Sequence, residues 1–127
     1  MQVDEISEPV VREAIGIHRQ LGPGLFESVY EAVLASRLQR AGLKVARQVM
    51  VPITFDDLVF EAAFKIDLLV EDQLVVEIKS VDHLAKAHSK QLLTYLRLMK
   101  LPVGLLLNFS AETMKEGIRR MVNNYRP

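Results

Sequence analysis

The stretch from Lys65 to Ser80, KIDLLVEDQLVVEIKS, places charged residues inside what is otherwise an apolar β-hairpin. Apolar runs on either side of a short acidic segment predict two antiparallel strands joined by a turn. A three-residue turn, residues 71–73, places Asp67 directly opposite Glu77 when the pairs are counted back from the turn. Opposed side chains on one face have Cβ atoms roughly 4.5–5.5 Å apart, and like charges there repel. Two carboxylates at this spacing predict a bound cation.

The residues next to Glu77 extend this hypothesis. Lys79 follows two positions later, so its side chain points to the same face of the strand as that of Glu77. The two carboxylates and the backbone carbonyl of Ile78 are hard oxygen ligands of the kind that Mg²⁺ or Mn²⁺ prefers. Lys79 would then orient a metal-bound water. The alternative is a surface ion pair between Glu77 and Lys79, and a turn of two or four residues would put Asp67 and Glu77 on opposite faces.

The rest of the chain predicts helices and strands around this hairpin. Apolar residues at helical spacing predict four helices, over residues 8–21, 27–41, 87–100 and 112–124. Alternating or continuous apolar residues predict four strands, over residues 45–53, 58–70, 74–81 and 103–109. The first three strands would form an antiparallel meander, and a helical crossover would make the fourth strand parallel to the third. We therefore expect one domain, residues 1–127, with a mixed sheet of about four strands in a three-layer α/β/α sandwich.

Composition excludes several classes of protein. The chain contains no cysteine, which rules out disulfides, thiolate nucleophiles and thiolate zinc sites. The longest nearly uncharged run, Leu101 to Phe109, is too short to cross a bilayer. The first residues, MQVDEISEPVV, are acidic and contain no apolar signal core. We expect a soluble cytoplasmic protein with no membrane partner.

The charge is balanced overall but uneven along the chain. Residues 1–78 carry 7 Lys and Arg against 13 Asp and Glu, whereas residues 79–127 carry 9 against 3. The two parts therefore have net charges of −6 and +6. An acidic half that holds metal and a basic half that holds phosphate would suit a nuclease. The alternative is chance segregation that folding mixes again.

Two further groups of polar residues fall on helix faces. Glu27 and Tyr30 lie three residues apart near the start of a predicted helix, where the helix dipole stabilises a carboxylate and Tyr30 suits the core. His88, Gln91 and Tyr95 share one face of another helix, beside its leucine stripe. That face could bind phosphate or form a solvated shoulder of the helix.

Together these residues resemble a known family. Asp67 followed by Glu77-Ile78-Lys79 resembles the D…(D/E)-x-K signature of the PD-(D/E)XK nuclease superfamily. The sequence QLLTY, residues 91–95, resembles the Q-x-x-x-Y motif of its RecB-like branch. Gly24, Glu27 and Tyr30 match the motif that names the small bacterial GxxExxY proteins, a group within that superfamily. The chain departs from the signature at Ile66, where the superfamily has a loosely kept proline.

The resemblance implies a restriction-endonuclease-like core and Mg²⁺- or Mn²⁺-dependent hydrolysis of phosphodiesters in nucleic acid, with DNA favoured over RNA. It implies Asp67 and Glu77 as metal ligands, with Glu27 completing the site, and Lys79 as the residue that positions the attacking water. It gives supporting roles to residues on the helices: Gln91, Tyr95, Tyr30 and His88. The alternative is an inactive nucleic-acid-binding or protein-interaction module on the same scaffold, and homo-oligomerisation stays open.

Overall fold

A computed structural model describes residues 1–126 and contains a mixed five-stranded sheet flanked by helices. The elements follow the order α1 (Val3–Leu21), α2 (Glu27–Arg40), β1 (Val45–Phe55), β2 (Leu58–Val70), β3 (Leu74–Lys79), α3 (Lys86–Met99), β4 (Val103–Asn108), α4 (Met114–Gly117) and β5 (Ile118–Val122). The α/β class, the antiparallel meander and the parallel pairing of the third and fourth strands are confirmed. No helix among residues 1–126 is long and apolar enough to span a membrane.

The strands lie in the sheet in the order β1-β2-β3-β4-β5, which makes β3 the central strand. β1 and β2 pair antiparallel, as do β2 and β3, whereas β3 and β4 pair in parallel across the α3 crossover. All but the last residue of β3 are buried, since the strand has neighbours on both edges and helices over both faces. Glu77 therefore lies in a central strand that is buried along nearly its whole length.

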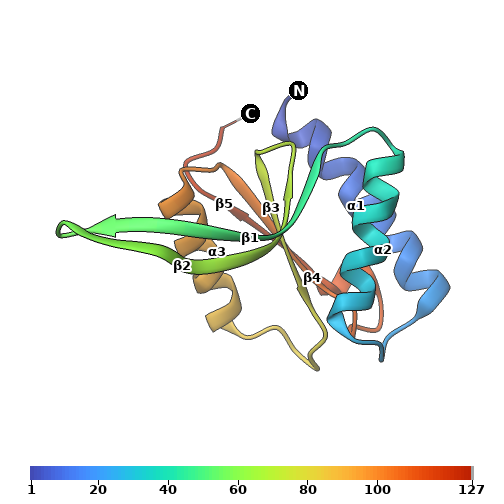
Figure 1. Ribbon diagram of the computed structural model, residues 1–127. Helices are drawn as coiled ribbons and strands as arrows, with labels where there is room; N and C mark the ends of the chain where they lie inside the picture. Colours follow the sequence, from blue (N-terminus) through green and yellow to red (C-terminus); the bar gives the residue numbers. More distant parts are fainter. Residues whose placement is uncertain (127) are drawn as a thin grey trace.

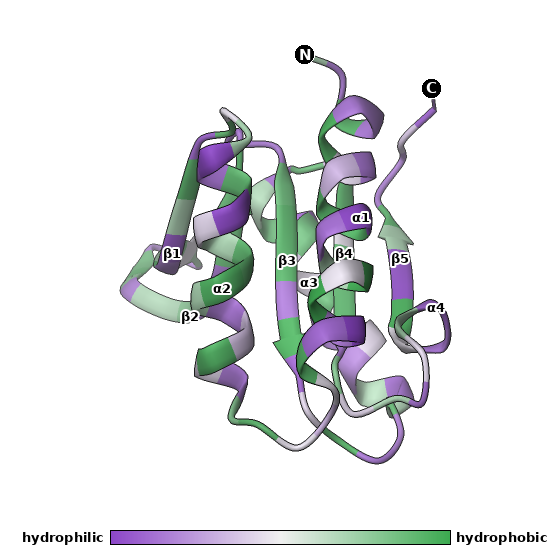
Figure 2. Ribbon diagram, turned by 90° about the vertical axis from the view of Figure 1, so that its right-hand side faces the viewer, coloured by the Kyte–Doolittle hydropathy of each residue, from purple (hydrophilic) through white to green (hydrophobic). Residues whose placement is uncertain are grey.

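Two apolar cores separate the three layers. Helices α1 and α2 cover one face of the sheet, and Tyr30, Leu34 and Leu38 of α2 pack there with apolar residues of β3 and β4. Helix α3 covers the opposite face (Figures 1 and 2), where Leu92 and Leu96 pack against Val75 and Leu106. The expected three-layer sandwich is thus confirmed.

The helix expected over residues 112–124 is wrong. That segment contains the short helix α4 and then β5, which pairs antiparallel with β4. The buried strand β4 would otherwise present an unpaired edge, and pairing satisfies its backbone groups better than a separate helix would. Gly117 is the last residue of α4, directly before β5 begins. A Cβ at this glycine would lie 2.3 Å from the carbonyl oxygen of Asn108, so the two segments approach too closely for any larger residue.

Helix α1 begins five residues earlier than the predicted start at residue 8, so Pro9 lies inside the helix. Burial explains the extension, because Val3 and Ile6 continue the buried stripe toward the N-terminus. Proline removes one hydrogen bond, to the carbonyl of Glu5. Glu5 lies on the exposed side, where water can take the place of the missing donor.

The outer parts of β1 and β2 project well beyond the rest of the sheet. We call residues 50–65 the arm. Figure 1 shows the arm as a two-stranded ribbon that extends away from the body of the molecule, beyond β3 and α3. At its tip, Asp56 and Asp57 form a two-residue turn, and both have positive φ.

Candidate active site

The hairpin that joins β2 to β3 has the predicted register. Val70 pairs with Leu74, Leu69 with Val75, and Leu68 with Val76, around a turn at residues 71–73. Glu71 and Asp72 of this turn adopt positive φ, and the backbone N–H of Glu71 donates to the carbonyl of Lys44. The same counting places Asp67 at the level of Glu77.

The regular ladder between β2 and β3 stops at Leu68, one step before Asp67. Instead, the Asp67 carboxylate accepts a hydrogen bond from the backbone N–H of Ile78, with Oδ2 2.8 Å from the nitrogen. Ile66 packs on the α3 side of the sheet and Leu68 on the opposite side. The side chain between them reaches across to β3 and takes the place of a strand-to-strand backbone bond.

Glu77 is a buried carboxyl group that lacks a full set of partners. Its exposed fraction is 6%, and its Oε1 atom has no hydrogen-bond partner among the described residues. Burial, followed by the negative charge of Asp67, raises its pKa to about 9, while Lys79 acts in the opposite direction. Without another cation the group holds a proton at neutral pH. An unpaired buried oxygen beside a second carboxylate fits the donor set of a hard divalent cation.

Tyr95 of α3 lies close to both carboxylates. Burial and the charges of Glu77 and Asp67 all raise the pKa of its phenol. Its ring stacks on Phe64 of β2, with centroids 4.1 Å apart and an interplanar angle of 6°. The phenol is therefore held beside the carboxylates by packing at the base of the arm.

The other residues expected at the site from β3 and α3 are more open. Lys79 is half-buried and occupies the same strand as Glu77, two residues later. Gln91 is exposed, one helical turn before Tyr95. His88 is half-buried, and its Nδ1 accepts a hydrogen bond of 3.0 Å from the backbone N–H of Ala85 at the start of α3.

Tyr30 and Glu27, the two residues of the GxxExxY motif that lie on α2, have different surroundings: Tyr30 is buried and Glu27 is exposed. Tyr30 is fully buried, stacks on Phe109 with centroids 4.4 Å apart, and donates from its hydroxyl to the carbonyl of Gly22. The same hydroxyl accepts from the backbone N–H of Leu25, which fixes the loop between α1 and α2. Glu27 is exposed at the start of α2. Among residues 1–126, no three Asp, Glu, His or Cys side chains come together as a ready-made metal site.

Two residues that the sequence analysis did not single out are connected to Asp67. Glu31, with an exposed fraction of 4%, accepts from Arg47 and from the amide of Gln48. The same amide nitrogen, Gln48 Nε2, lies 3.4 Å from Asp67 Oδ1. Gln48 has a φ of 52° and lies where the β1–β2 pairing skips a step, between Arg47 and Val49. This irregularity turns its side chain toward both carboxylates.

A signal for Glu31 was available in the sequence, because it lies next to Tyr30 on the apolar stripe of α2. A charged residue on such a stripe needs a buried partner. Gln48 carried no such signal, since a left-handed glutamine cannot be recognised from a strand pattern.

A model of the PD-(D/E)XK nuclease superfamily matches residues 4–121. The match covers the two carboxylates, the lysine and the helices on both faces of the sheet. The chain therefore belongs to the PD-(D/E)XK nuclease superfamily. Comparison with curated proteins gave no match, and neither did comparison with solved structures.

In this PD-(D/E)XK protein the residues that resemble the superfamily signature lie on adjacent strands. Asp67 is near the point where β2 leaves β3, and Glu77 and Lys79 end the central strand. β3 and β4 run in parallel and finish together, Lys79 opposite Asn108. The residues that resemble the superfamily signature thus include the buried carboxyl group whose oxygen lacks a partner.

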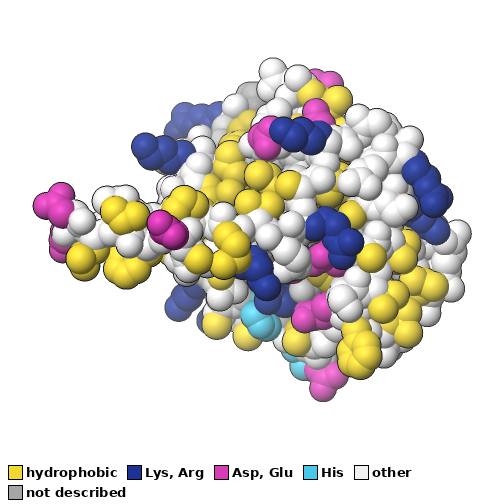
Figure 3. All heavy atoms as spheres, in the orientation of Figure 1, with side chains coloured by type: hydrophobic (Ala, Val, Ile, Leu, Met, Phe, Trp, Pro, Cys, Tyr) yellow, Lys and Arg dark blue, Asp and Glu magenta, His cyan; other side chains and the backbone are white. Residues whose placement is uncertain are grey.

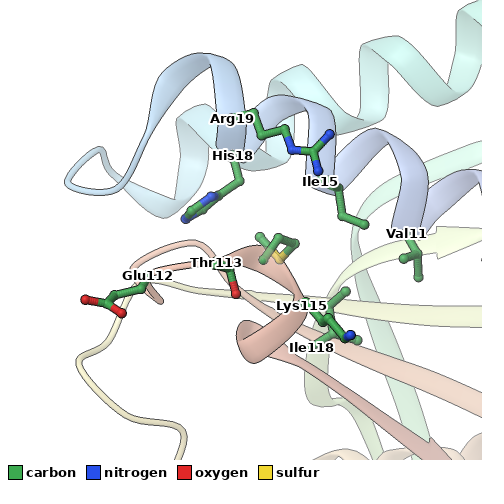
Figure 4. Close-up of a pocket in the computed structure, with 9 residues that line it drawn as sticks. Val11, Ile15, His18, Arg19, Glu112, Thr113, Lys115 and Ile118 are labelled. Atoms are coloured by element: carbon green, nitrogen blue, oxygen red, sulfur yellow. The ribbon is translucent and has the colours of Figure 1, made fainter.

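A separate cavity of about 510 Å³ lies between α1 and the segment that contains α4. Figure 4 shows Val11, Ile15 and His18 of α1 facing this segment across the cavity. The Nε2 atom of His18 lies 2.8 Å from the carbonyl oxygen of Ala111, so this histidine links the two walls. The residues that line the cavity include none of the signature residues.

Proposed function

We propose that this chain is a metal-dependent nuclease whose active centre contains Asp67, Glu77 and Lys79. The observation that carries the proposal is the buried Glu77 carboxyl group, which has an oxygen without a partner and lies beside a second carboxylate in a superfamily of nucleases. Nucleases of this superfamily typically use divalent metal ions, and we propose Mg²⁺ or Mn²⁺ here.

Asp67 and Glu77 would hold the cation, together with the backbone carbonyl of Ile78. A bound divalent cation supplies positive charge to the scissile phosphate and lowers the pKa of a water that it binds. Binding requires Glu77 to lose its proton, so proton and metal compete for this carboxyl group. Once Glu77 is deprotonated, the bound cation would supply the opposite charge that its buried carboxylate otherwise lacks.

Lys79 would orient the attacking water and stabilise negative charge that develops on the phosphate. Its place on the same strand as Glu77 supports this role, because residues two apart share a face. Tyr95 feels the charge of both carboxylates and would support the site, and we propose that Gln91 and His88 contact the substrate from the same helix.

The role of Glu27, which lies on α2 and not on the strands of the hairpin, is less direct. Its exposed position at the start of α2 fits contact with substrate or a metal site completed when nucleic acid binds. Glu31, one turn further along, holds Gln48 and through it approaches Asp67. We propose that Glu31 and Gln48 orient Asp67. Gly24, Glu27 and Tyr30 further support assignment to the GxxExxY group, with Tyr30 stabilising the loop.

The substrate we propose is nucleic acid, DNA before RNA, bound mainly through its phosphates. Backbone contacts provide affinity without sequence information, so binding should weaken steeply with salt. α3 offers the cations for such contacts: residues 83–111 contain Lys86, Lys90, Arg97 and Lys100 but no Asp or Glu.

The test is cleavage of single- and double-stranded DNA and RNA with Mg²⁺, Mn²⁺ or EDTA. We expect cleavage that needs the metal and that falls at least about 100-fold in Glu77→Gln and Lys79→Met. The matched control is Glu8→Gln, which changes an exposed carboxylate on α1 and should leave the rate unchanged.

Cleavage that persists in both site variants would exclude these residues as the catalytic centre. Metal binding without cleavage of any of the four substrates would instead support the inactive module, which the exposed position of Glu27 also fits. Calorimetric titration with Mg²⁺ and Mn²⁺ separates these outcomes.

A further inference from the structure

The arm carries a continuous apolar face. Ile53 pairs with Phe60 and Phe55 with Leu58, so these four side chains lie on the same face of the ribbon. The register of the two strands shifts between Ile53 and Val51, and beyond this irregularity the pair formed by Val51 and Phe64 leads toward the body of the protein. We call this set the arm face: Val51, Ile53, Phe55, Leu58, Phe60 and Phe64.

The arm face begins in the core of the protein and then loses its cover. At the base, Phe64 stacks on Tyr95 and packs with the apolar cluster beneath α3. Further out, Phe55 is 68% exposed, Leu58 60% and Phe60 46%. The uncovered surface therefore continues outward from a packed core, and Figure 3 shows hydrophobic side chains along the arm.

A two-stranded ribbon of this kind is only marginally stable in water without a third strand or a packed face. Exposed apolar surface that is contiguous and rimmed by polar residues marks an interaction site. The open edge of β1 is a poorer site for a partner strand than the arm face, because Pro52 lacks the N–H that such pairing needs. The face, rather than the edge, is the surface to be covered.

The charges of the arm indicate what covers it. Its tip carries Asp56 and Asp57, with Glu61 close by, and its base lies against α3 through the contact of Phe64 with Tyr95. Lys86, Lys90, Arg97 and Lys100 belong to this basic helix and the residue that follows it. In Figure 3 acidic side chains occupy the end of the arm, and Lys and Arg side chains surround its base. An arm of a second copy, running in the opposite direction, would place each acidic tip beside a basic α3.

We propose that two copies of this chain associate through their arm faces, packed antiparallel about a two-fold axis. Such an interface is self-complementary, because the same apolar residues meet across the axis and each acidic tip meets the partner's basic base. A nucleic-acid partner fits less well, since phosphates would be repelled by Asp56, Asp57 and Glu61. The proposal does not depend on catalysis.

The test is sedimentation equilibrium of the full chain between about 1 and 100 µM, a range that brackets micromolar association. We expect a dimer that Phe55→Glu dissociates, with at least a tenfold rise in the dimer Kd, because the substitution buries a charge among apolar anchors. Val59→Glu is the matched control. Val59 is also 68% exposed and pairs with Thr54, on the opposite face of the arm, so this variant should remain dimeric.

A second variant tests the orientation of the two arms. Asp56→Lys with Asp57→Lys should weaken the dimer several-fold in low salt and little in high salt, since the contact with α3 is electrostatic. Circular dichroism at the same concentrations reports whether each variant keeps its fold. Phe60→Ser provides a milder change should Phe55→Glu fail to fold, and we expect it to weaken association as well.

Three results would overturn the proposal. The first is a wild-type chain that is monomeric across the whole range. The second is equal dissociation by Phe55→Glu and Val59→Glu. The third is a monomer whose affinity for nucleic acid falls in Phe55→Glu, which would assign the arm face to nucleic acid instead.

Discussion

The two ends of β2 have similar compositions and opposite environments. Its inner end, residues 66–70, lies between β1 and β3 and alternates buried with half-buried side chains. Its outer end, residues 58–65, is exposed at every position but Phe64, although it contains Leu58, Val59 and Phe60. Apolar sequence makes a strand in both halves. Whether the strand is buried depends on neighbouring elements. The outer half pairs with β1, whereas the inner half also pairs with β3 and is covered by helices.

The comparison also explains where the chemistry can lie. A carboxylate on the exposed arm is hydrated, so water supplies its hydrogen-bond partners. Glu77 of β3 is buried between β2 and β4 and lies near a second carboxylate. The contrast between a dry inner half and a wet outer half can be tested directly.

The largest effect should come from Glu77. The folded protein holds its proton up to about pH 9, whereas the unfolded chain releases it near the ordinary value of 4.5. The folded state therefore binds more protons between these values, and its free energy of unfolding falls as pH rises through this window. For the metal-free protein we expect a decrease of up to about 1.4 kcal/mol per pH unit, measured by urea unfolding in EDTA.

Glu77→Gln should abolish most of this slope, because glutamine cannot titrate. Glu8→Gln, on the exposed surface of α1, should keep it. Added Mg²⁺ should stabilise the wild type more at pH 8.5 than at pH 6, since only the ionised carboxylate binds the cation. Equal slopes in the wild type and in Glu77→Gln would mean that Glu77 is not the buried acid described here.

A pair of valines compares the two halves with the same chemical change. Val70 is fully buried at the inner end, and Val59 is 68% exposed on the arm. Val70→Ala should lower the free energy of unfolding by about 2–3 kcal/mol, from lost burial and an incompletely filled cavity. Val59→Ala should lower it by less than about 1 kcal/mol, mainly through weaker strand propensity. Similar losses in urea unfolding would contradict the division of β2.

Much of this fold was predictable because its signals are local. The turn at residues 71–73 and the alternation on both sides of it gave the register that places Asp67 near Glu77. The parallel pairing of β4 followed from a buried strand after a helix. Register depends on the period of two residues and on turn length, and both can be counted in a sequence.

The remainder depended on partners distant in the chain. Residues 112–124 have helical spacing, but their second half pairs as β5 with the edge of β4, and that edge exists only in the assembled sheet. The exposure of the arm has the same cause, since its sequence is as apolar as that of a core strand. At the site, the contact of Gln48 with Glu31 and Asp67 depends on a left-handed residue that interrupts the β1–β2 ladder, and no periodicity encodes it.

Gln48 therefore offers a sharper test at the boundary between the two halves. Gln48→Ala keeps the positive φ and removes the amide from Glu31, which should cost about 1 kcal/mol. Gln48→Gly removes the same amide but relieves a left-handed conformation worth about 1 kcal/mol, so its stability should be close to that of the wild type. Both variants should weaken Mg²⁺ binding equally in calorimetry if the amide orients Asp67. Unchanged binding in both would limit Gln48 to a structural role.

The smallest effect should be seen at the tip of the arm in the monomer, measured at a concentration below that of dimer formation, because there the turn sets local stability. Asp56 and Asp57 form a two-residue loop with φ of 50° and 63°, an arrangement that favours glycine at the second position. Asp57→Gly should stabilise the closed tip by up to about 1 kcal/mol, roughly a fivefold rise in the hydrogen-exchange protection of arm amides. Asp57→Ala removes the same charge without relieving the backbone and should leave protection unchanged or lower. The protection of β3 should be the same in both variants, because the arm opens independently of the enclosed half. A parallel change in β3 would show that the two halves of β2 unfold as one unit.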